Sequence, residues 1–271
     1  MAYKKLFSPT KIGSIKVKNR VVMTAMGVDV SDHDGTANEK TVAYYRERAK
    51  GGVGLIITEY TRINEKDGVV ASGQLSMSSD KYIKPFQKVA VAVHREGAKI
   101  FVQLHHPGRQ NVVLFPTFWS INEKLAKIFP FYWKVFSSIA GKADAESLSD
   151  PKMIQMMNKY MKPLRAPSDV PAGLGLSVFG NQKIKPFTTG EIHNLIRQFV
   201  KAAKRVQQSG ADGVELHAGH GYLLNQFLSP YTNIRSDEYG GSFENRLRIM
   251  KELIEGIHRE CGADFPISVR L

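Results

Sequence analysis

One phrase recurs four times in this sequence: a helical run ends at glycine, and a short turn leads into an apolar strand. The copies read "RAKGGVGLIITEY" (48–60), "REGAKIFVQLH" (95–105), "QSGADGVELHAG" (208–219) and "ECGADFPISVRL" (260–271). Glycine just past a helix takes the left-handed C′ position, and an apolar strand is typical of a parallel sheet covered on both faces. With "RVVMTAM" (20–26) as the first strand, the sequence predicts five parallel strands.

The segments between these strands are predicted to be helices. Thr188 and Glu191 form a capping-box pattern, and apolar residues then follow helical spacing until Gly210. Ser242 is placed to cap a second amphipathic helix. Strands that alternate with helices form βαβ units, so the fold is either a doubly wound sheet or a (β/α)8 barrel.

Two observations favour an incomplete TIM-type (β/α)8 barrel with about five of its eight βα units. No G-x-G-x-x-G follows the first strand, and the glycines of 51–54 precede a strand, where they read as a helix stop. Polar residues such as Gln103, His217 and Arg270 also gather at the ends of strands. In a barrel these strand ends converge on one face, where active sites lie.

A long segment interrupts the repeat after the third strand. We interpret residues 1–271 as the N-terminal part of one barrel, and 107–186 as an inserted lid or accessory segment within it. The segment contains both tryptophans, Trp119 and Trp133, and the sequence predicts helices over 121–136 and 151–161.

Composition restricts the class of protein. A single cysteine, Cys261, excludes a disulfide framework or a multi-cysteine metal site. The net charge of +13 comes without a nucleic-acid motif, so we expect small anionic ligands as partners and no nucleic acid. No apolar run is long enough to cross a membrane, and we expect a cytoplasmic protein.

Four motifs resemble the Old Yellow Enzyme family of FMN-dependent ene-reductases, also described as NADH:flavin oxidoreductases. They are "LFSPTKIGSIKVKNRVVMTAM", "QLHHPGR", "APSDVP" and "VELHAGHGYLLNQFLSPYTNIRSDEYGGSFENRLR", in the family's order. Within this family, the motifs most resemble those of the branch that contains the 2,4-dienoyl-CoA, 2-enoate, steroid and bile-acid reductases. The resemblance spans nearly the whole chain outside 112–164.

The resemblance implies roles for individual residues. His217 and His220 match the pair that binds the substrate carbonyl oxygen, and Tyr222 matches the proton donor. The positions that match cofactor-binding residues, which would contact FMN, are Thr24, Ala25, Met26, Tyr60, Gln103 and Arg270. A bulky, anionic enone or enoate would suit the basic, aromatic insertion.

The reaction implied is reduction of the C=C bond of an α,β-unsaturated carbonyl compound. NADH or NADPH would reduce FMN, whose N5 atom would then deliver hydride to the β-carbon. His217 and His220 would stabilise the enolate oxygen, and Tyr222 would protonate the α-carbon. Tyrosine suits this role because a pKa of about 10 keeps it protonated at neutral pH.

Two substitutions and the length of the chain depart from the family pattern. Ala25 replaces a common proline, and Tyr60 replaces a small residue. The sequence ends with the fifth strand where the family has eight, so we expect a fragment, acting with a complementary C-terminal fragment or as a homo-oligomer. FAD and an iron–sulfur cluster are expected only if a longer parent protein carries them.

Two other functions fit parts of the sequence. One is a metal-dependent barrel hydrolase that uses imidazoles at neighbouring strand ends, namely His105, His106, His217 and His220. The other is a non-catalytic fragment or subunit that needs its C-terminal complement. The flavoenzyme hypothesis includes no metal site.

Overall fold

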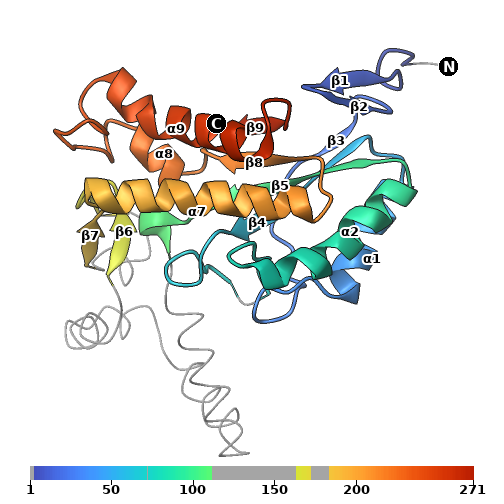
Figure 1. Cartoon of the computed structure of the whole chain (residues 1–271), viewed down its shortest axis with the longest axis horizontal. Coiled ribbons are helices and arrows are strands. Elements are labelled where there is room, and N and C mark those ends of the chain that lie inside the picture. The colour runs from blue at the N-terminus through green and yellow to red at the C-terminus, as the bar shows by residue number, and fades with distance from the viewer. Residues whose placement is uncertain (1–2, 72, 112–162, 172–182) are drawn as a thin grey trace, which may run out of the picture.

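The computed structural model describes residues 3–71, 73–111, 163–171 and 183–271 (Figure 1). Its centre is a five-stranded parallel sheet in the order β3-β4-β5-β8-β9. The strands are β3 (Val22–Met23), β4 (Leu55–Arg62), β5 (Lys99–His105), β8 (Gly213–His217) and β9 (Ile267–Arg270). Their order in space is their order along the chain, without the reversal of a doubly wound sheet, so the half-barrel prediction is confirmed.

Long helices connect the strands, as predicted. They are α1 (Glu39–Lys50), α2 (Ile83–Arg95), α7 (Thr189–Gln208) and α9 (Phe243–Cys261). Thr188 caps α7 in a capping box with Glu191, and the Ser242 hydroxyl accepts a hydrogen bond from Asn245 N at the start of α9. A short 3-10 helix, η1 (Asp80–Tyr82), leads into α2.

The two faces of the sheet have different neighbours. On β5, Ile100, Val102 and Leu104 belong to the large core between the sheet and the helices. Phe101 alternates with them and belongs to a second, smaller apolar cluster. Gln103 and His105 continue the alternation of Phe101, so the inner face becomes polar towards the carboxyl ends of the strands.

A hairpin that the sequence analysis missed closes the opposite end of this inner face. It is formed by β1 (Thr10–Ile12) and β2 (Ile15–Val17). Val17 packs in the cluster that contains Phe101, and Ser14 Oγ donates a 2.6 Å hydrogen bond to the carbonyl of Asp264. The hairpin lies at the far end of the molecule from β6 and β7 (Figure 1), so the polar strand ends are the open end.

Part of the inserted segment is described. A 3-10 turn, η2 (Gly108–Gln110), follows β5, and β6 (Leu164–Ala166) pairs in parallel with β7 (Ile184–Pro186) beside it. The helices predicted over 121–136 and 151–161 lie outside the described residues. The lid or accessory role of 107–186 therefore stays a prediction. Within the described ranges, no helix is both long and apolar enough to cross a membrane.

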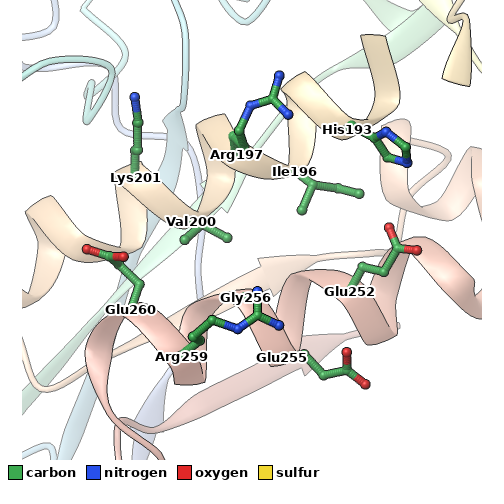
Figure 2. A pocket seen from close by; sticks show the side chains of 10 residues that line it. All are labelled: His193, Ile196, Arg197, Val200, Lys201, Glu252, Glu255, Gly256, Arg259 and Glu260. Atoms are coloured by element: carbon green, nitrogen blue, oxygen red, sulfur yellow. The ribbon is translucent and has the colours of Figure 1, made fainter. Parts of the chain in front are cut away.

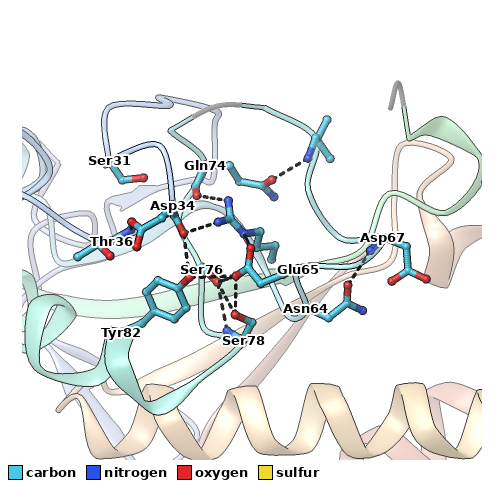
Figure 3. Close-up of polar contacts among 12 residues, drawn as sticks. Ser31, Asp34, Thr36, Asn64, Glu65, Asp67, Gln74, Ser76, Ser78 and Tyr82 are labelled. Carbon is cyan, nitrogen blue, oxygen red and sulfur yellow. Dashed lines mark hydrogen bonds and ion pairs between the residues drawn. The ribbon is translucent and has the colours of Figure 1, made fainter. Parts of the chain in front are cut away.

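The loop after β4 is held by a buried arginine and by polar contacts of Glu65, Ser76, Ser78 and Tyr82, which are labelled in Figure 3. Arg62 is 2% exposed, and its guanidinium contacts Glu65 Oε2 at 2.9 Å and donates to the carbonyls of Gln74 and Asp34. The other oxygen of Glu65 accepts hydrogen bonds from the hydroxyl groups of Ser76, Ser78 and Tyr82. Since every donor on this carboxylate comes from the loop or its flank, the network fixes the loop at the open end of the sheet.

Candidate active site

The site is built in rungs across neighbouring strand ends. Gln103 on β5 lies opposite Glu215 on β8, and Glu215 lies opposite Ser268 on β9. Two residues further along β8, His217 lies opposite Arg270. Alternation along a strand places both rungs on the inner face. The parallel sheet therefore brings an amide, a carboxylate, an imidazole and a guanidinium together at the carboxyl ends of its strands.

His217, His220 and Tyr222 form one cluster, as predicted. His217 Nε2 lies 3.4 Å from His220 Nδ1, and the two rings meet edge-on with centroids 5.1 Å apart. The Tyr222 ring lies 5.0 Å from that of His217. His217 is buried, whereas His220 is exposed, so the pair runs from the interior of the site to its rim.

The turn after β8 explains why His220 sits between glycines. His220 has a φ of +57° and Gly221 a φ of +74°, both in the left-handed region. A Cβ on Gly221 would lie 2.3 Å from Nε2 of Gln110, which donates to the His220 carbonyl at 3.1 Å. A left-handed histidine in a tight turn is strained, and such strain is found at functional sites.

Burial sets the protonation states of this cluster. Burial, with smaller contributions from His220 and Arg270, lowers the pKa of His217 to about 4, so its imidazole is neutral at pH 7. Burial raises the pKa of Tyr222, which keeps its hydroxyl protonated. The cluster can therefore donate hydrogen bonds to an oxygen without carrying charge on His217.

Gln103 and Arg270 already have protein partners. Gln103 Nε2 donates to Glu215 Oε1 at 2.7 Å, and Ser268 Oγ donates to Glu215 Oε2 at 3.3 Å. Arg270 Nη1 donates to the carbonyl of Ala25 at 3.0 Å. That last bond joins the strand at one edge of the sheet to the segment that follows the strand at the other edge, so the sheet is curled as in a barrel.

The first strand is shorter than the predicted 20–26, so Thr24, Ala25 and Met26 follow β3 instead of ending it. Ala25 is buried, and the side chains of Thr24 and Met26 are exposed. Met26 is 58% exposed, and such an apolar side chain beside polar strand ends can contact a flat ligand.

Tyr60 forms a wall beside this segment. Its hydroxyl donates to both carboxylate oxygens of Asp29, at 3.0 and 3.1 Å, and its ring lies 5.3 Å from that of His105. A Cβ at Gly27 would lie 2.7 Å from Cε1 of Tyr60, so the ring packs directly on the backbone there.

Three acidic residues of the site are not among the predicted catalytic or cofactor-binding residues. Glu215 holds the middle rung, Asp29 holds Tyr60, and Glu59 is 1% exposed with Oε2 accepting from the amides of Val28 and Asp29. Burial raises the pKa of Glu59 to about 7. Glu215 could have been found from the sequence, since it lies two residues before His217 and shares its face of the strand.

Comparison with known proteins decides the family. The sequence model of the NADH:flavin oxidoreductase / NADH oxidase family matches residues 5–114 and 136–271. The chain belongs to this family. Its fold matches the crystal structure of Old Yellow Enzyme from Pichia sp. AKU4542 with a TM-score of 0.74 at 28% identity, covering 98% of this chain and 59% of that one. The Old Yellow Enzyme relatives are TIM barrels, in agreement with the curled parallel sheet.

Curated relatives in the family are enzymes. An NADH oxidase of Thermoanaerobacter brockii is 38% identical over 265 residues, which cover 98% of this chain and 33% of that protein. A cinnamate reductase of Clostridium sporogenes is 34% identical over 274 residues, which cover 99% of this chain and 34% of that protein. This chain thus spans about a third of the length of these two relatives.

Old Yellow Enzyme family members bind FMN and use NAD(P)H, and the residues of this site fit a flavin. The pyrimidine edge of a flavin carries both hydrogen-bond acceptors and an N–H donor. Gln103 offers an amide and Arg270 a guanidinium, which are suitable partners for such an edge. The exposed side chain of Met26 offers an apolar surface for the flat ring.

Metal-binding groups and grooves elsewhere in the described residues were compared with this site. Among the described residues, no group of three or more His, Cys, Asp or Glu side chains is arranged to hold a metal ion. A groove also lies between α7 and α9 (Figure 2), lined by residues such as Arg197, Lys201 and Glu255. It contains none of the strand-end residues and lies on the outer, helical layer.

Proposed function

We propose that this chain carries the flavin- and substrate-binding face of an NAD(P)H-dependent ene-reductase that reduces α,β-unsaturated carbonyl compounds. The observation that supports it best is the position of the neutral His217 and the neighbouring His220 beside Tyr222, on the same face as Gln103 and Arg270. Two imidazoles beside a protonated phenol provide what enone reduction needs at the substrate oxygen and α-carbon.

When bound, FMN would supply the hydride chemistry of the reaction. Gln103, Arg270 and the segment 24–26 would hold it, and Tyr60 would border it. His217 and His220 would bind the carbonyl oxygen and stabilise the negative charge that develops there. Tyr222, with its raised pKa, would keep a proton at neutral pH and donate it to the α-carbon.

The substrate class and the partners of the whole protein extend this proposal. The basic insertion would suit a bulky enone or enoate with an anionic group. FAD, an iron–sulfur cluster and a complementary C-terminal fragment would belong to a longer assembly. Homo-oligomerisation also stays a proposal.

The test is the visible spectrum of the 271-residue chain after incubation with FMN and gel filtration. A retained flavin band that bleaches with NADH or NADPH and recovers on addition of cyclohex-2-enone supports the proposal. Folded protein that retains no flavin contradicts it for this chain and favours the non-catalytic alternative. A matched sample with free zinc, assayed for hydrolysis of esters, tests the metal alternative.

A further inference from the structure

His105 is one of the most completely buried polar side chains of the site. It is 1% exposed, and both ring nitrogens are buried without a hydrogen-bond partner among the described residues. Nearly all buried polar atoms in proteins have a partner, so a group with two unmet nitrogens calls for a ligand or an ordered water. The proposed reaction assigns no role to this residue.

The position of His105 places it against the predicted substrate-binding side chains. Its ring meets that of Tyr222 edge-on with centroids 4.4 Å apart, and the His217 ring lies 5.6 Å away. The centroid of the Tyr60 ring lies 5.3 Å from that of His105. The carbonyl end of a substrate bound by His217 and His220 would therefore lie beside His105.

Two polar side chains near His105 have polar neighbours of their own, whereas neither ring nitrogen of His105 has a hydrogen-bond partner among the described residues. The Tyr60 hydroxyl is committed to Asp29, and the adjacent imidazole of His106 lies 3.3 Å from Asp67 Oδ1 and accepts from Gly108 N. Burial, with His217 and His106 nearby, holds the pKa of His105 well below its usual range, so its imidazole is neutral. A neutral imidazole offers one donor and one acceptor.

We propose that His105 is a specificity-determining residue that binds a second polar group of the substrate, a hydroxyl carried on the enone apart from its carbonyl. This inference rests on the proposed function, because it takes the substrate to lie at His217 and Tyr222. A hydroxyl can both donate to and accept from the imidazole, and it carries no charge that a neutral, buried site would have to stabilise. The preferred substrates are hydroxylated enones.

The test compares two probes that differ only in this group, cyclohex-2-enone and 4-hydroxycyclohex-2-enone. Dissociation constants are measured by calorimetry on the full chain loaded with FMN. We expect the hydroxylated probe to bind about three- to tenfold more tightly to the wild-type protein, as one hydrogen bond allows. His105→Leu should remove the difference and leave the affinity for cyclohex-2-enone within about twofold, whereas a role in packing alone would weaken both probes equally.

Two further measurements keep the test decisive. His105→Gln keeps a polar side chain and should retain part of the discrimination. In wild-type protein, ¹⁵N shifts of the His105 ring nitrogens should move with the hydroxylated probe and not with the other, which needs no variant to fold. No preference for the hydroxylated probe, or a preference that survives His105→Leu, overturns the inference and leaves an ordered water only. If the chain retains no FMN and binds neither enone, the proposed function fails and the inference falls with it.

Discussion

The side-chain amide of Gln103 donates a 2.7 Å hydrogen bond from Nε2 to Oε1 of Glu215, across the junction of β5 and β8. A carboxylate only accepts, so this bond fixes which end of the amide faces Glu215 and leaves the carbonyl of Gln103 directed elsewhere. Ser268 holds the second oxygen of the same carboxylate at 3.3 Å. Glu215 therefore orients a residue that is expected to contact the flavin.

Replacing Glu215 with Gln is expected to weaken FMN binding about three- to tenfold, because a glutamine no longer dictates the orientation of Gln103. Titration of the chain with FMN, followed by flavin fluorescence, measures the change. Glu255→Gln makes the same change of charge in the outer groove and should bind FMN like the wild type. Equal affinities for the two variants would show that Glu215 has no orienting role.

Arg270→Gln is expected to loosen the segment after β3, because it removes the hydrogen bond from Nη1 to the Ala25 carbonyl. A loss of about 1 kcal/mol in the free energy of local opening would raise the rate of amide exchange at residues 25 and 26 about fivefold, as measured by hydrogen–deuterium exchange. Arg259→Gln on α9 is the control. Unchanged exchange in Arg270→Gln would mean that the contact does not hold the two edges of the sheet.

Glu59 is expected to make stability fall as the pH rises. Its pKa in the folded protein, about 7, lies above the ordinary 4.5, so its contribution is complete below about pH 4.5 and is lost as the pH rises through about 7. Between pH 5 and pH 8, the free energy of unfolding of Glu59→Gln should therefore rise by about 1–3 kcal/mol relative to that of the wild type, as measured by urea unfolding. A difference that does not change with pH would refute the raised pKa.

His217 is expected to act in the opposite direction. Its pKa of about 4 lies below the ordinary 6.5, so its contribution is present above about pH 6.5 and is lost as the pH falls through about 4. Ring resonances of His217 in an NMR titration should therefore change near pH 4 and stay constant between pH 6 and 8. A midpoint above pH 6 would show that the site is more hydrated than the structure indicates.

Tyr222→Phe is expected to lower turnover of cyclohex-2-enone about 100-fold or more, because the variant lacks the proposed proton donor. FMN affinity and the rate at which NADH bleaches the bound flavin should stay near wild-type values. Tyr231→Phe removes a hydroxyl from an exposed tyrosine shortly after the same strand and is the matched control. Equal turnover in the two variants would exclude Tyr222 as the donor.

Much of the fold was predictable because its signals are local. The glycine-to-strand phrase located four of the five strands, and the caps at Thr188 and Ser242 located the starts of α7 and α9. The β1–β2 hairpin was missed although Gly13, with a φ of +55°, and Ser14 form a two-residue turn between short alternating segments. Strands of three residues carry too little periodicity to stand out beside the longer ones.

The residues of the site that lie on strands could be predicted from strand alternation. The contacts that depend on the path of the loops could not. Period-two spacing from Gln103 and His217 places His105 and Glu215 on the inner face. The hydrogen bonds from Tyr60 to Asp29 join residues from the ends of different strands and arise from a left-handed turn, with a φ of +53° at Asp29. No local pattern in the sequence encodes that contact.

The close packing of Tyr60 on Gly27 makes these two positions depend on each other in directed evolution. The ring is fixed by Asp29 and His105, so it cannot swing away from a new methyl group at position 27. Gly27→Ala would be selected against until Tyr60 has become small, after which the same alanine would fit. A search that changes one residue at a time would reach the double variant only through position 60, so libraries that reshape this wall need both positions randomised together.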